Sequence, residues 1–258
     1  MKTVLAFDFG ASTGRAIKAH FDGEKITYEE IHRFENIPLN VDGYICHDVD
    51  MIFSEVKQAI DKAGDIDSLA FDTWGVDYAL LDKDGKIIHE PYHYRDERTK
   101  NALEKAFSKM NAEEIYAETG NQIMNINTLF QLICDENKDK AETLLFMPDL
   151  FSYFLTGEKV CEMSIASTSQ MLDPYKREWD KELLETVGIP TDILCDIVKP
   201  GTVIGNVTES ICTELGIDSA KVVAVGGHDT ASAVVSVPTT EDDFVYIIHI
   251  LHHLYMPM

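Results

Sequence analysis

Basic residues are scarce in this sequence. Among its 258 residues, 22 Lys and Arg stand against 45 Asp and Glu, which gives a formal net charge of -23. A surface with this excess of negative charge repels nucleic-acid phosphates and anionic membrane surfaces, so we expect neither as a partner. Nucleotides are not excluded, because backbone N–H groups and a bound metal ion can hold phosphates without a basic surface.

Closely spaced cysteines and long apolar segments are also missing. The five cysteines are odd in number and scattered, which fits neither a disulfide framework nor a zinc site, so we expect reduced thiols. They are Cys46, Cys134, Cys161, Cys195 and Cys212. Residues 1–10 contain a strand rather than a secretion signal, and no stretch reaches the roughly 18 apolar residues of a membrane span. The expected location is the cytoplasm.

Internal repeats, low-complexity tracts and Pro/Gly/Ser-rich linkers do not occur before about residue 237. Hydrophobic residues make up 45% of the chain and charged residues 26%, close to the averages of globular proteins. This composition differs from that of disordered chains, which are poor in apolar residues. We therefore expect a folded body that forms one continuous domain.

Residues 248–258 differ in composition from that body. They hold three of the nine His and no Asp, Glu, Lys or Arg. We expect an aberrant tail here. A metal site at His249, His252 and His253 is the alternative, but an unsupported terminus does not supply the surrounding hydrogen bonds that orient metal-binding histidines.

Apolar runs separated by turn residues open the chain. Thr3–Phe9, Arg15–Phe21 and Lys25–Phe34 predict three antiparallel strands. With Asp50 as the N-cap, apolar residues at helical spacing then predict a helix that Gly64 ends. A buried strand is predicted next, over residues 68–73.

The middle of the chain adds a hairpin and several helices. Val76–Leu81 and Lys86–His89, joined by an Asp-Gly turn, predict antiparallel strands, so we expect a mixed sheet. Helices are predicted over residues 98–110, 112–118, 128–137, 149–155, 180–187 and 209–215. A strand over Lys221–Val225 leads through two glycines into a helix over His228–Val235. The pattern predicts an α/β fold.

The first candidate site is a motif between two predicted strands, Asp8 followed by a Gly-rich turn. A carboxylate at a strand end can hold a hydrated magnesium ion, and N–H groups of the turn can meet phosphate oxygens. A Gly-rich hairpin with a solvated Asp is the competing interpretation. The turn residues are Gly10, Ala11, Ser12, Thr13, Gly14 and Arg15.

Two further motifs follow predicted strands. In Asp72-Thr73-Trp74-Gly75-Val76-Asp77, carboxylates and an aromatic ring suit a sugar, whereas a β-turn with a buried Trp is the simpler interpretation. In Gly226-Gly227-His228-Asp229-Thr230, Asp229 lies at a helix start close to any ligand over the strand ends. The alternative for Asp229 is a first-turn acid without further function.

The order and spacing of these three motifs resemble the FGGY carbohydrate kinases over residues 3–247. Ala11 stands where the xylulose and glycerol kinases of the family usually have Thr. The resemblance is strongest to the branch of the family that phosphorylates L-rhamnulose. The segments that carry this closer resemblance are 74–77, Tyr94-Arg95-Asp96, Leu155-Thr156-Gly157 and 164–173.

The resemblance implies a ribonuclease-H-like domain of the actin and hexokinase type, with a mixed sheet flanked by helices, over residues 1–247. It implies ATP and Mg²⁺ as cofactors and a small ketose as substrate, converted to its 1-phosphate. By this likeness Asp229 is the catalytic base, Asp8 helps to hold the magnesium ion, and Gly10–Arg15 approach the ATP phosphates. Gly75, His228, Asp229 and Thr230 are the implied sugar contacts.

The sequence departs from the family pattern near its end. After Tyr246 a family member would continue into a second, ATP-binding domain, which we expect to be absent here, leaving little kinase activity. Two alternatives to the L-rhamnulose kinase half remain open. One is a kinase of another ketose or polyol, and the other is a non-catalytic module that binds a sugar. The oligomeric state is not predicted.

Overall fold

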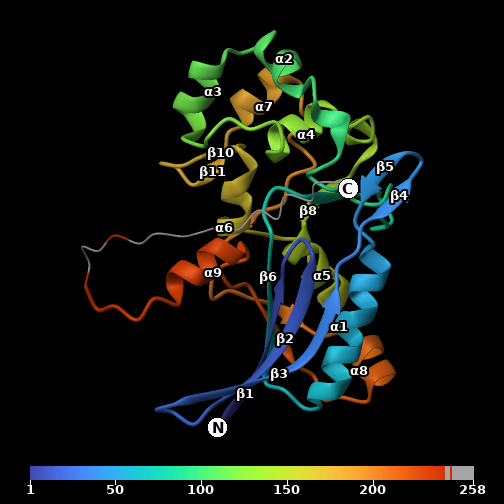
Figure 1. Ribbon diagram of the computed structural model, residues 1–258, viewed down its shortest axis with the longest axis vertical. Coiled ribbons are helices and arrows are strands. Elements are labelled where there is room, and N and C mark those ends of the chain that lie inside the picture. Colours follow the sequence, from blue (N-terminus) through green and yellow to red (C-terminus); the bar gives the residue numbers. More distant parts are fainter. Residues whose placement is uncertain (242–244, 246–258) are drawn as a thin grey trace, which may run out of the picture.

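The computed structural model of the protein describes residues 1–241 and residue 245. The strands of its central sheet are β1 (Lys2–Phe9), β2 (Thr13–Phe21), β3 (Ile26–Glu35), β6 (Ser68–Thr73), β13 (Val203–Asn206) and β14 (Lys221–Val223). They form a six-stranded sheet in the order β13-β14-β6-β1-β2-β3 (Figure 1). β1, β6 and β14 run parallel, whereas the pairs β1–β2, β2–β3 and β13–β14 are antiparallel, so the predicted mixed sheet is confirmed.

Alternation along β1 and β6 gives the sheet two different faces, because successive side chains of a strand point to opposite sides. Leu5, Phe7 and Phe9 are each 1% exposed and point into the main hydrophobic core. Asp8 and Asp72 point to the other face, where side chains are partly exposed. The strand pattern thus places two carboxylates together on the open face.

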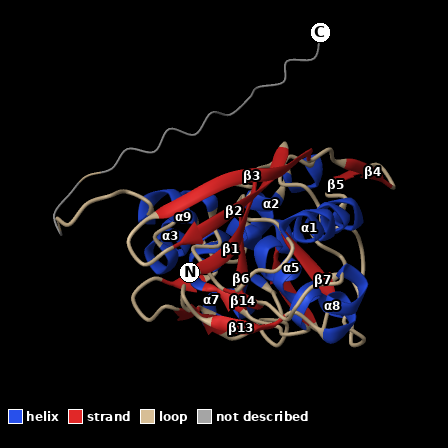
Figure 2. Cartoon of the chain, turned by 90° about the horizontal axis from the view of Figure 1, so that it is seen from below, coloured by secondary structure: helices blue, strands red, loops and turns tan. Residues whose placement is uncertain are grey.

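Three helices cover the apolar face of the sheet: α1 (Val49–Ala63), α5 (Met147–Thr156) and α8 (Glu209–Leu215) (Figure 2). Asp48, not the predicted Asp50, is the N-cap of α1, because its side chain accepts the hydrogen bond from Met51 N at 2.9 Å. A carboxylate that caps must precede the helical residues, and Asp50 already lies in the first turn.

A second hydrophobic core lies beyond the end of the sheet, where α2, α3, α4 and α7 gather (Figure 1). Its helices are α2 (Ala102–Phe107), α3 (Ala112–Thr119), α4 (Thr128–Ile133), α6 (Met163–Ala166) and α7 (Lys181–Val187). Its short strands are β7 (Tyr78–Leu81), β8 (Thr143–Phe146), β9 (Cys161–Glu162), β10 (Leu172–Asp173), β11 (Glu178–Trp179) and β12 (Ile197–Val198). The remaining elements are β4 (Leu39–Val41), β5 (Tyr44–Cys46), the 3₁₀ turns 97–99, 138–140 and 167–169, and α9 (Asp229–Val235).

Two predicted patterns are wrong in this second region. The expected hairpin partner 86–89 makes only an isolated bridge between Ile87 and Leu81, and β7 pairs along its length with β8 instead. The predicted helix 128–137 ends at Ile133. It ends there because the buried Asp135 carboxylate accepts hydrogen bonds from Tyr78 Oη (2.8 Å) and Asn137 N (2.9 Å), which turns the chain.

Some predictions fall on residues that are not described. The tail 248–258, its three histidines and the end of the domain at residue 247 lie outside the described residues. No helix in the described part of the chain is long and apolar enough to span a membrane.

Phe151 of α5 joins the sheet to its helical cover, and its removal tests the main core. It is fully buried, and its ring meets that of Phe9 edge to face at 5.4 Å. Phe151→Ala should lower the free energy of unfolding by about 3 to 5 kcal/mol, measured by urea denaturation. Tyr175→Ala, at a residue that is 92% exposed, is the control and should change it by less than about 0.5 kcal/mol. A small effect at Phe151 would show that this packing is not formed.

Candidate active site

The three sequence motifs meet at the carboxyl ends of β1 and β6. Asp8 and Asp72 are direct partners in the parallel register of these strands. Trp74 N donates to Phe9 O at 3.1 Å, and Thr73 N donates to Gly227 O at 2.9 Å. Backbone hydrogen bonds therefore bind the first and third motifs to the second, as the predicted common site requires.

The turn after Asp8 is held in a tight conformation by its own backbone and by Asn36. Gly10 N donates to Thr13 O at 2.8 Å, while Asn36 donates from its backbone N to Ser12 O at 2.9 Å and from Nδ2 to Gly10 O at 3.1 Å. Because the turn is fixed before any ligand arrives, its N–H groups can meet phosphate oxygens without reordering. This geometry suits the predicted phosphate contacts of Gly10–Arg15.

Asp8 pairs with Arg15 across the β1–β2 hairpin. Arg15 Nε and Nη2 both donate to Asp8 Oδ2, at 2.8 and 2.5 Å. Both side chains remain partly exposed, at 44% for Arg15 and 33% for Asp8. Asp8 can therefore offer its second oxygen to a cation while Arg15 holds the first.

Asp72 joins Asp8 and Asp229 in an acidic cluster on the open face. Burial, and then the negative charges of Asp8 and Asp229, raise the pKa of Asp72 to about 7. Repulsion of this kind is relieved by a divalent cation, and carboxylate oxygens are the ligands that Mg²⁺ prefers. The donor set of Asp8 and Asp72 fits a magnesium ion. Sequence reasoning offered Asp72 only as a possible partner of sugar hydroxyls, although its place opposite Asp8 follows from pairing the two strand ends.

Asp229 begins α9 and keeps one carboxylate oxygen available. Thr230 N and Oγ1 donate to Asp229 Oδ1 at 2.5 and 3.1 Å, and His228 Nε2 lies 3.3 Å from the same oxygen. No hydrogen bond from the described residues reaches Oδ2, and the side chain is 43% exposed. Burial lowers the pKa of His228 although the charge of Asp229 acts in the opposite direction. The lowered pKa favours a neutral imidazole.

The Gly75 loop has a strained backbone. Val76 has a φ of 69°, a value that is rare for a β-branched residue and that occurs mostly at functional sites. Its N donates to Thr168 Oγ1 at 3.0 Å, and its O accepts from Thr128 Oγ1 at 2.7 Å. A Cβ on Gly75 would lie only 3.0 Å from Thr168 Cγ2, so a larger residue here would push Thr168 aside.

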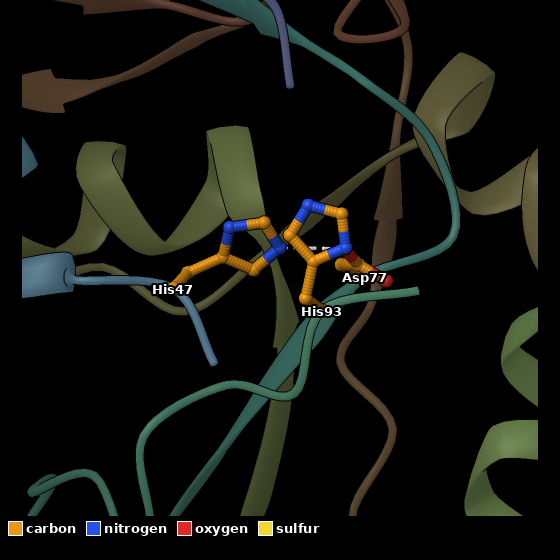
Figure 3. A group of neighbouring side chains, drawn as sticks. All are labelled: His47, Asp77 and His93. Atoms are coloured by element: carbon orange, nitrogen blue, oxygen red, sulfur yellow. Dashed lines mark hydrogen bonds and ion pairs between the residues drawn. The ribbon is translucent and has the colours of Figure 1, made fainter. Parts of the chain in front are cut away.

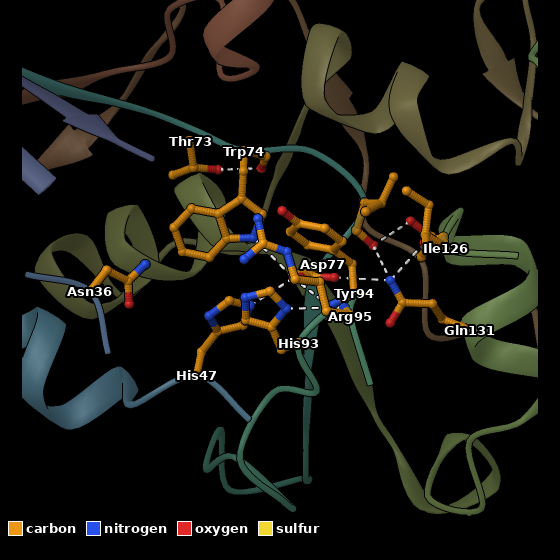
Figure 4. Close-up of polar contacts among 12 residues, drawn as sticks. Asn36, His47, Thr73, Trp74, Asp77, His93, Tyr94, Arg95, Ile126 and Gln131 are labelled. Atoms are coloured by element: carbon orange, nitrogen blue, oxygen red, sulfur yellow. Dashed lines mark hydrogen bonds and ion pairs between the residues drawn. The ribbon is translucent and has the colours of Figure 1, made fainter. Parts of the chain in front are cut away.

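A buried carboxylate, Asp77, anchors the Gly75 loop from below (Figure 4). Asp77 Oδ2 accepts from His47 Nε2 at 2.6 Å, Trp74 Nε1 at 3.0 Å and Tyr94 N at 3.1 Å, and Oδ1 accepts from Gln131 Nε2 at 2.9 Å. Asp77 is 0% exposed and Trp74 is 5% exposed. The predicted burial of Trp74 is thus confirmed, whereas the contact of this motif with a sugar stays a prediction.

His47, Asp77 and His93 lie close enough to suggest a metal site, with one possible ligand atom from each within 4.8 Å of the others (Figure 3). The geometry favours a supporting cluster instead. The Asp77 oxygens already accept four hydrogen bonds, and the rings of His47 and His93 stack at 4.6 Å. Burial, and then His47, lower the pKa of His93 to about 4, so His93 is neutral.

A second buried carboxylate, Glu162, anchors the loop that carries Asp229. Its Oε2 accepts from Gly227 N at 2.9 Å, Ile165 N at 3.1 Å and Ser164 Oγ at 2.5 Å, and its Oε1 accepts from Ser164 N at 2.9 Å. His228 N in turn donates to Ser164 Oγ at 3.3 Å. Sequence reasoning missed Glu162, which is the N-cap of α6, because Glu is not among the residues preferred at that position.

Comparison with known proteins shows the family. The model of the FGGY family of carbohydrate kinases, N-terminal domain, matches residues 3–236. The chain is 38% identical over 252 residues to a rhamnulokinase of Oceanobacillus iheyensis, which covers 94% of this chain and 53% of that protein. It is 42% identical over 260 residues to a rhamnulokinase of Pectobacterium atrosepticum, covering 96% and 51%. The chain belongs to the FGGY family of carbohydrate kinases, as the motifs predicted, and spans about half the length of the curated relatives that it matches.

Solved structures share the fold. A ligand-bound xylulose kinase from Lactobacillus acidophilus superposes with a TM-score of 0.78 at 21% identity, covering 89% of this chain and 48% of that one. A glycerol kinase from Plasmodium falciparum with ADP gives 0.68 at 15% identity, covering 87% and 48%. The predicted α/β fold class, a mixed sheet flanked by helices, is thereby confirmed.

The raised pKa of Asp72 predicts a pH-dependent loss of stability. Between its ordinary value of 3.8 and about 7, the folded protein holds a proton that the unfolded chain has released, so raising the pH destabilises the fold. Asp72→Asn removes this effect. From pH 4 to pH 7 the wild type should therefore lose about 1 to 3 kcal/mol of unfolding free energy relative to Asp72→Asn. Urea denaturation of both proteins at each pH measures this difference.

The matched control is Asp139→Asn, at a side chain that is 74% exposed. Its difference from the wild type should stay constant over the same pH range. If Asp72→Asn behaves in the same way, the acidic cluster does not hold a proton.

Loss of the Glu162 contacts should loosen the Asp229 loop. Glu162→Gln replaces one acceptor oxygen with an NH₂ group that faces other donors, so we expect a loss of about 1 to 3 kcal/mol in unfolding free energy. Hydrogen exchange of the Gly227 amide should also become faster. Asp135→Asn is the control, because Asp135 is a buried carboxylate with hydrogen bonds outside the site. Equal exchange at Gly227 in both variants would count against a specific role of Glu162.

Proposed function

We propose that this chain is the sugar-binding half of an ATP-dependent kinase that converts L-rhamnulose to L-rhamnulose 1-phosphate. The observation that carries the proposal is the open Oδ2 of Asp229 beside the strand ends that present Asp8 and the Gly10–Arg15 turn. The choice of sugar rests on the similarity to proteins named rhamnulokinase, at 38 and 42% identity. Shared fold alone would leave the substrate open.

Asp229 acts as the base in this proposal. Its free oxygen accepts the proton of the attacking sugar hydroxyl, while Thr230 and the neutral His228 hold the other oxygen in place. The Gly75 loop and His228 contact the sugar. Phosphoryl transfer needs mainly positioning and charge stabilisation, so one carboxylate is sufficient as proton acceptor.

The Gly10–Arg15 turn meets the ATP phosphates, and Asp8 and Asp72 would hold magnesium, which would neutralise charge on the transferred phosphoryl group. The Arg15 guanidinium group, which is bound to Asp8, can instead donate its hydrogen bonds to a phosphate oxygen. The residues described here thus supply a base, a phosphate turn and carboxylates for a cation. The absence of a second domain, weak turnover, a cytoplasmic location and the lack of a nucleic-acid partner stay predictions.

Calorimetric titration of the 258-residue chain with L-rhamnulose tests the substrate, with D-xylulose and glycerol as competitors. L-Rhamnulose should bind at least about tenfold more tightly than either competitor. Gly75→Ala should weaken binding at least tenfold, because the added methyl group forces Thr168 to move. Tighter binding of a competitor would favour the kinase of another ketose or polyol, and no binding of any of the three would refute a sugar site.

A coupled ADP-release assay with MgATP and L-rhamnulose tests the base. If the chain turns over, Asp229→Asn should lower kcat at least about a hundredfold while sugar affinity changes little, because the amide cannot accept the proton. The control is Asp139→Asn, which should match the wild type. Sugar binding without any turnover would favour the non-catalytic module.

A further inference from the structure

Two thiols lie near the Asp229 loop, because one of them, Cys161, precedes the Glu162 that accepts a hydrogen bond from Gly227 N. Cys161 is the first residue of β9, and Cys195 precedes β12, the parallel partner of β9. Cys161 N donates to Asp196 O at 3.0 Å. The Cys161 and Cys195 Sγ atoms both contact the carbonyl oxygen of Leu144, at 4.0 and 3.7 Å. The shared acceptor brings the two sulfur atoms to the same side of β8.

The two thiols differ in exposure and in acidity. Cys161 is 0% exposed, whereas Cys195 is partly exposed. Interaction with Cys195, and then burial, raise the pKa of Cys161, whereas interaction with Cys161, and then the charge of Lys159, lower the pKa of Cys195. An accessible thiol with a lowered pKa beside a buried second thiol is the arrangement in which oxidation of the first is resolved by the second.

The other three cysteines lack this arrangement. Cys46 is buried, and burial, followed by the charge of Asp96, raises its pKa to about 11. Cys134 accepts from Lys105 Nζ at 3.7 Å, and Cys212 donates to Val207 O at 3.6 Å. They therefore serve as internal controls for thiol chemistry within the same chain.

We propose that Cys161 and Cys195 form an oxidation site that closes to a disulfide in the presence of hydrogen peroxide. The Cys195 thiolate attacks one peroxide oxygen, and the O–O bond breaks. The hydroxide that leaves combines with the proton released from the Cys195 thiol to form water. The resulting sulfenic acid is attacked by Cys161, the S–O bond breaks, and the oxygen leaves as a second water with the remaining proton. Two thiols are oxidised and one peroxide is reduced to two waters.

The disulfide would act on the Asp229 loop through Glu162, the residue after Cys161. A disulfide requires an S–S distance of about 2.05 Å, much shorter than the closest approach of two thiols that are not covalently bonded. Closing it draws β9 and β12 together and displaces the Glu162 carboxylate, which accepts from Gly227 N at 2.9 Å. The disulfide should therefore loosen the Gly227 amide. That it weakens sugar binding rests on the proposed function.

Oxidation of the native 258-residue chain with hydrogen peroxide, followed by alkylation and mass spectrometry, tests the site. The expected product has lost two hydrogens, about 2 Da, and yields a peptide that links Cys161 to Cys195. Cys161→Ser should instead stop at a sulfenic acid on Cys195, which dimedone traps. Cys134→Ser is the matched control and should form the same link as the wild type.

Two results would overturn the proposal. One is oxidation of Cys195 to the sulfinic acid with Cys161 still alkylated, and the other is a Cys195 that reacts no faster than Cys134 and Cys212. Hydrogen exchange then tests the coupling: the Gly227 amide should exchange at least about tenfold faster in the oxidised chain and recover after reduction. An unchanged rate would refute the link to the loop. Both measurements are independent of sugar binding, so a failed proposed function would not be mistaken for failure here.

Discussion

Two buried carboxylates must be fully hydrogen bonded, and the geometry of the site depends on this requirement. A buried charge without partners is strongly unfavourable, so Asp77 and Glu162 draw donors from every nearby segment. The donors are the backbone and side chains of the loops that face the open side of the sheet. Asp77 holds the Gly75 loop through Trp74, and Glu162 holds the Asp229 loop through Gly227. The two loops are therefore held in place by the hydrogen bonds that these buried charges require.

The alternation of side chains between the two faces of the central sheet is a second constraint on the site. Because β1 and β6 bury every second side chain under α1 and α5, the residues between are left on the open face. Asp8 and Asp72 come together on this face because β1 and β6, which are distant in the sequence, pair in parallel register. Burial is the main cause of the raised pKa of Asp72, and strand register adds to it by placing Asp8 alongside.

The three motifs could be found in the sequence because their signals are local, whereas their joint role in one site was implied by the resemblance to the FGGY carbohydrate kinases. Strand ends, glycine turns and the helix start at Asp229 are encoded within a few residues, and parallel strands align their carboxyl ends. The supports were not predictable in this way. Gln131 donates to Asp77 from α4, and Glu162 reaches Gly227 across many residues of chain. Such contacts depend on packing between segments, which no short pattern records. The Asp50 cap was wrong because the neighbouring Asp48 offers an equally good local signal, and the 86–89 strand was wrong because β7 pairs with the distant β8.

The Asp77 cluster also has an evolutionary consequence. His47, Trp74, Tyr94 and Gln131 come from four separate segments, yet each donates to the same carboxylate. Tyr94 donates from its backbone N, but a substitution of the His47, Trp74 or Gln131 side chain leaves an acceptor oxygen short of a donor unless another segment supplies it. A tolerated substitution at one of these positions therefore depends on the residues at the others, so we expect the positions to change together in related proteins. Recombination between distant relatives would fail most often where it separates residue 47 from residue 131.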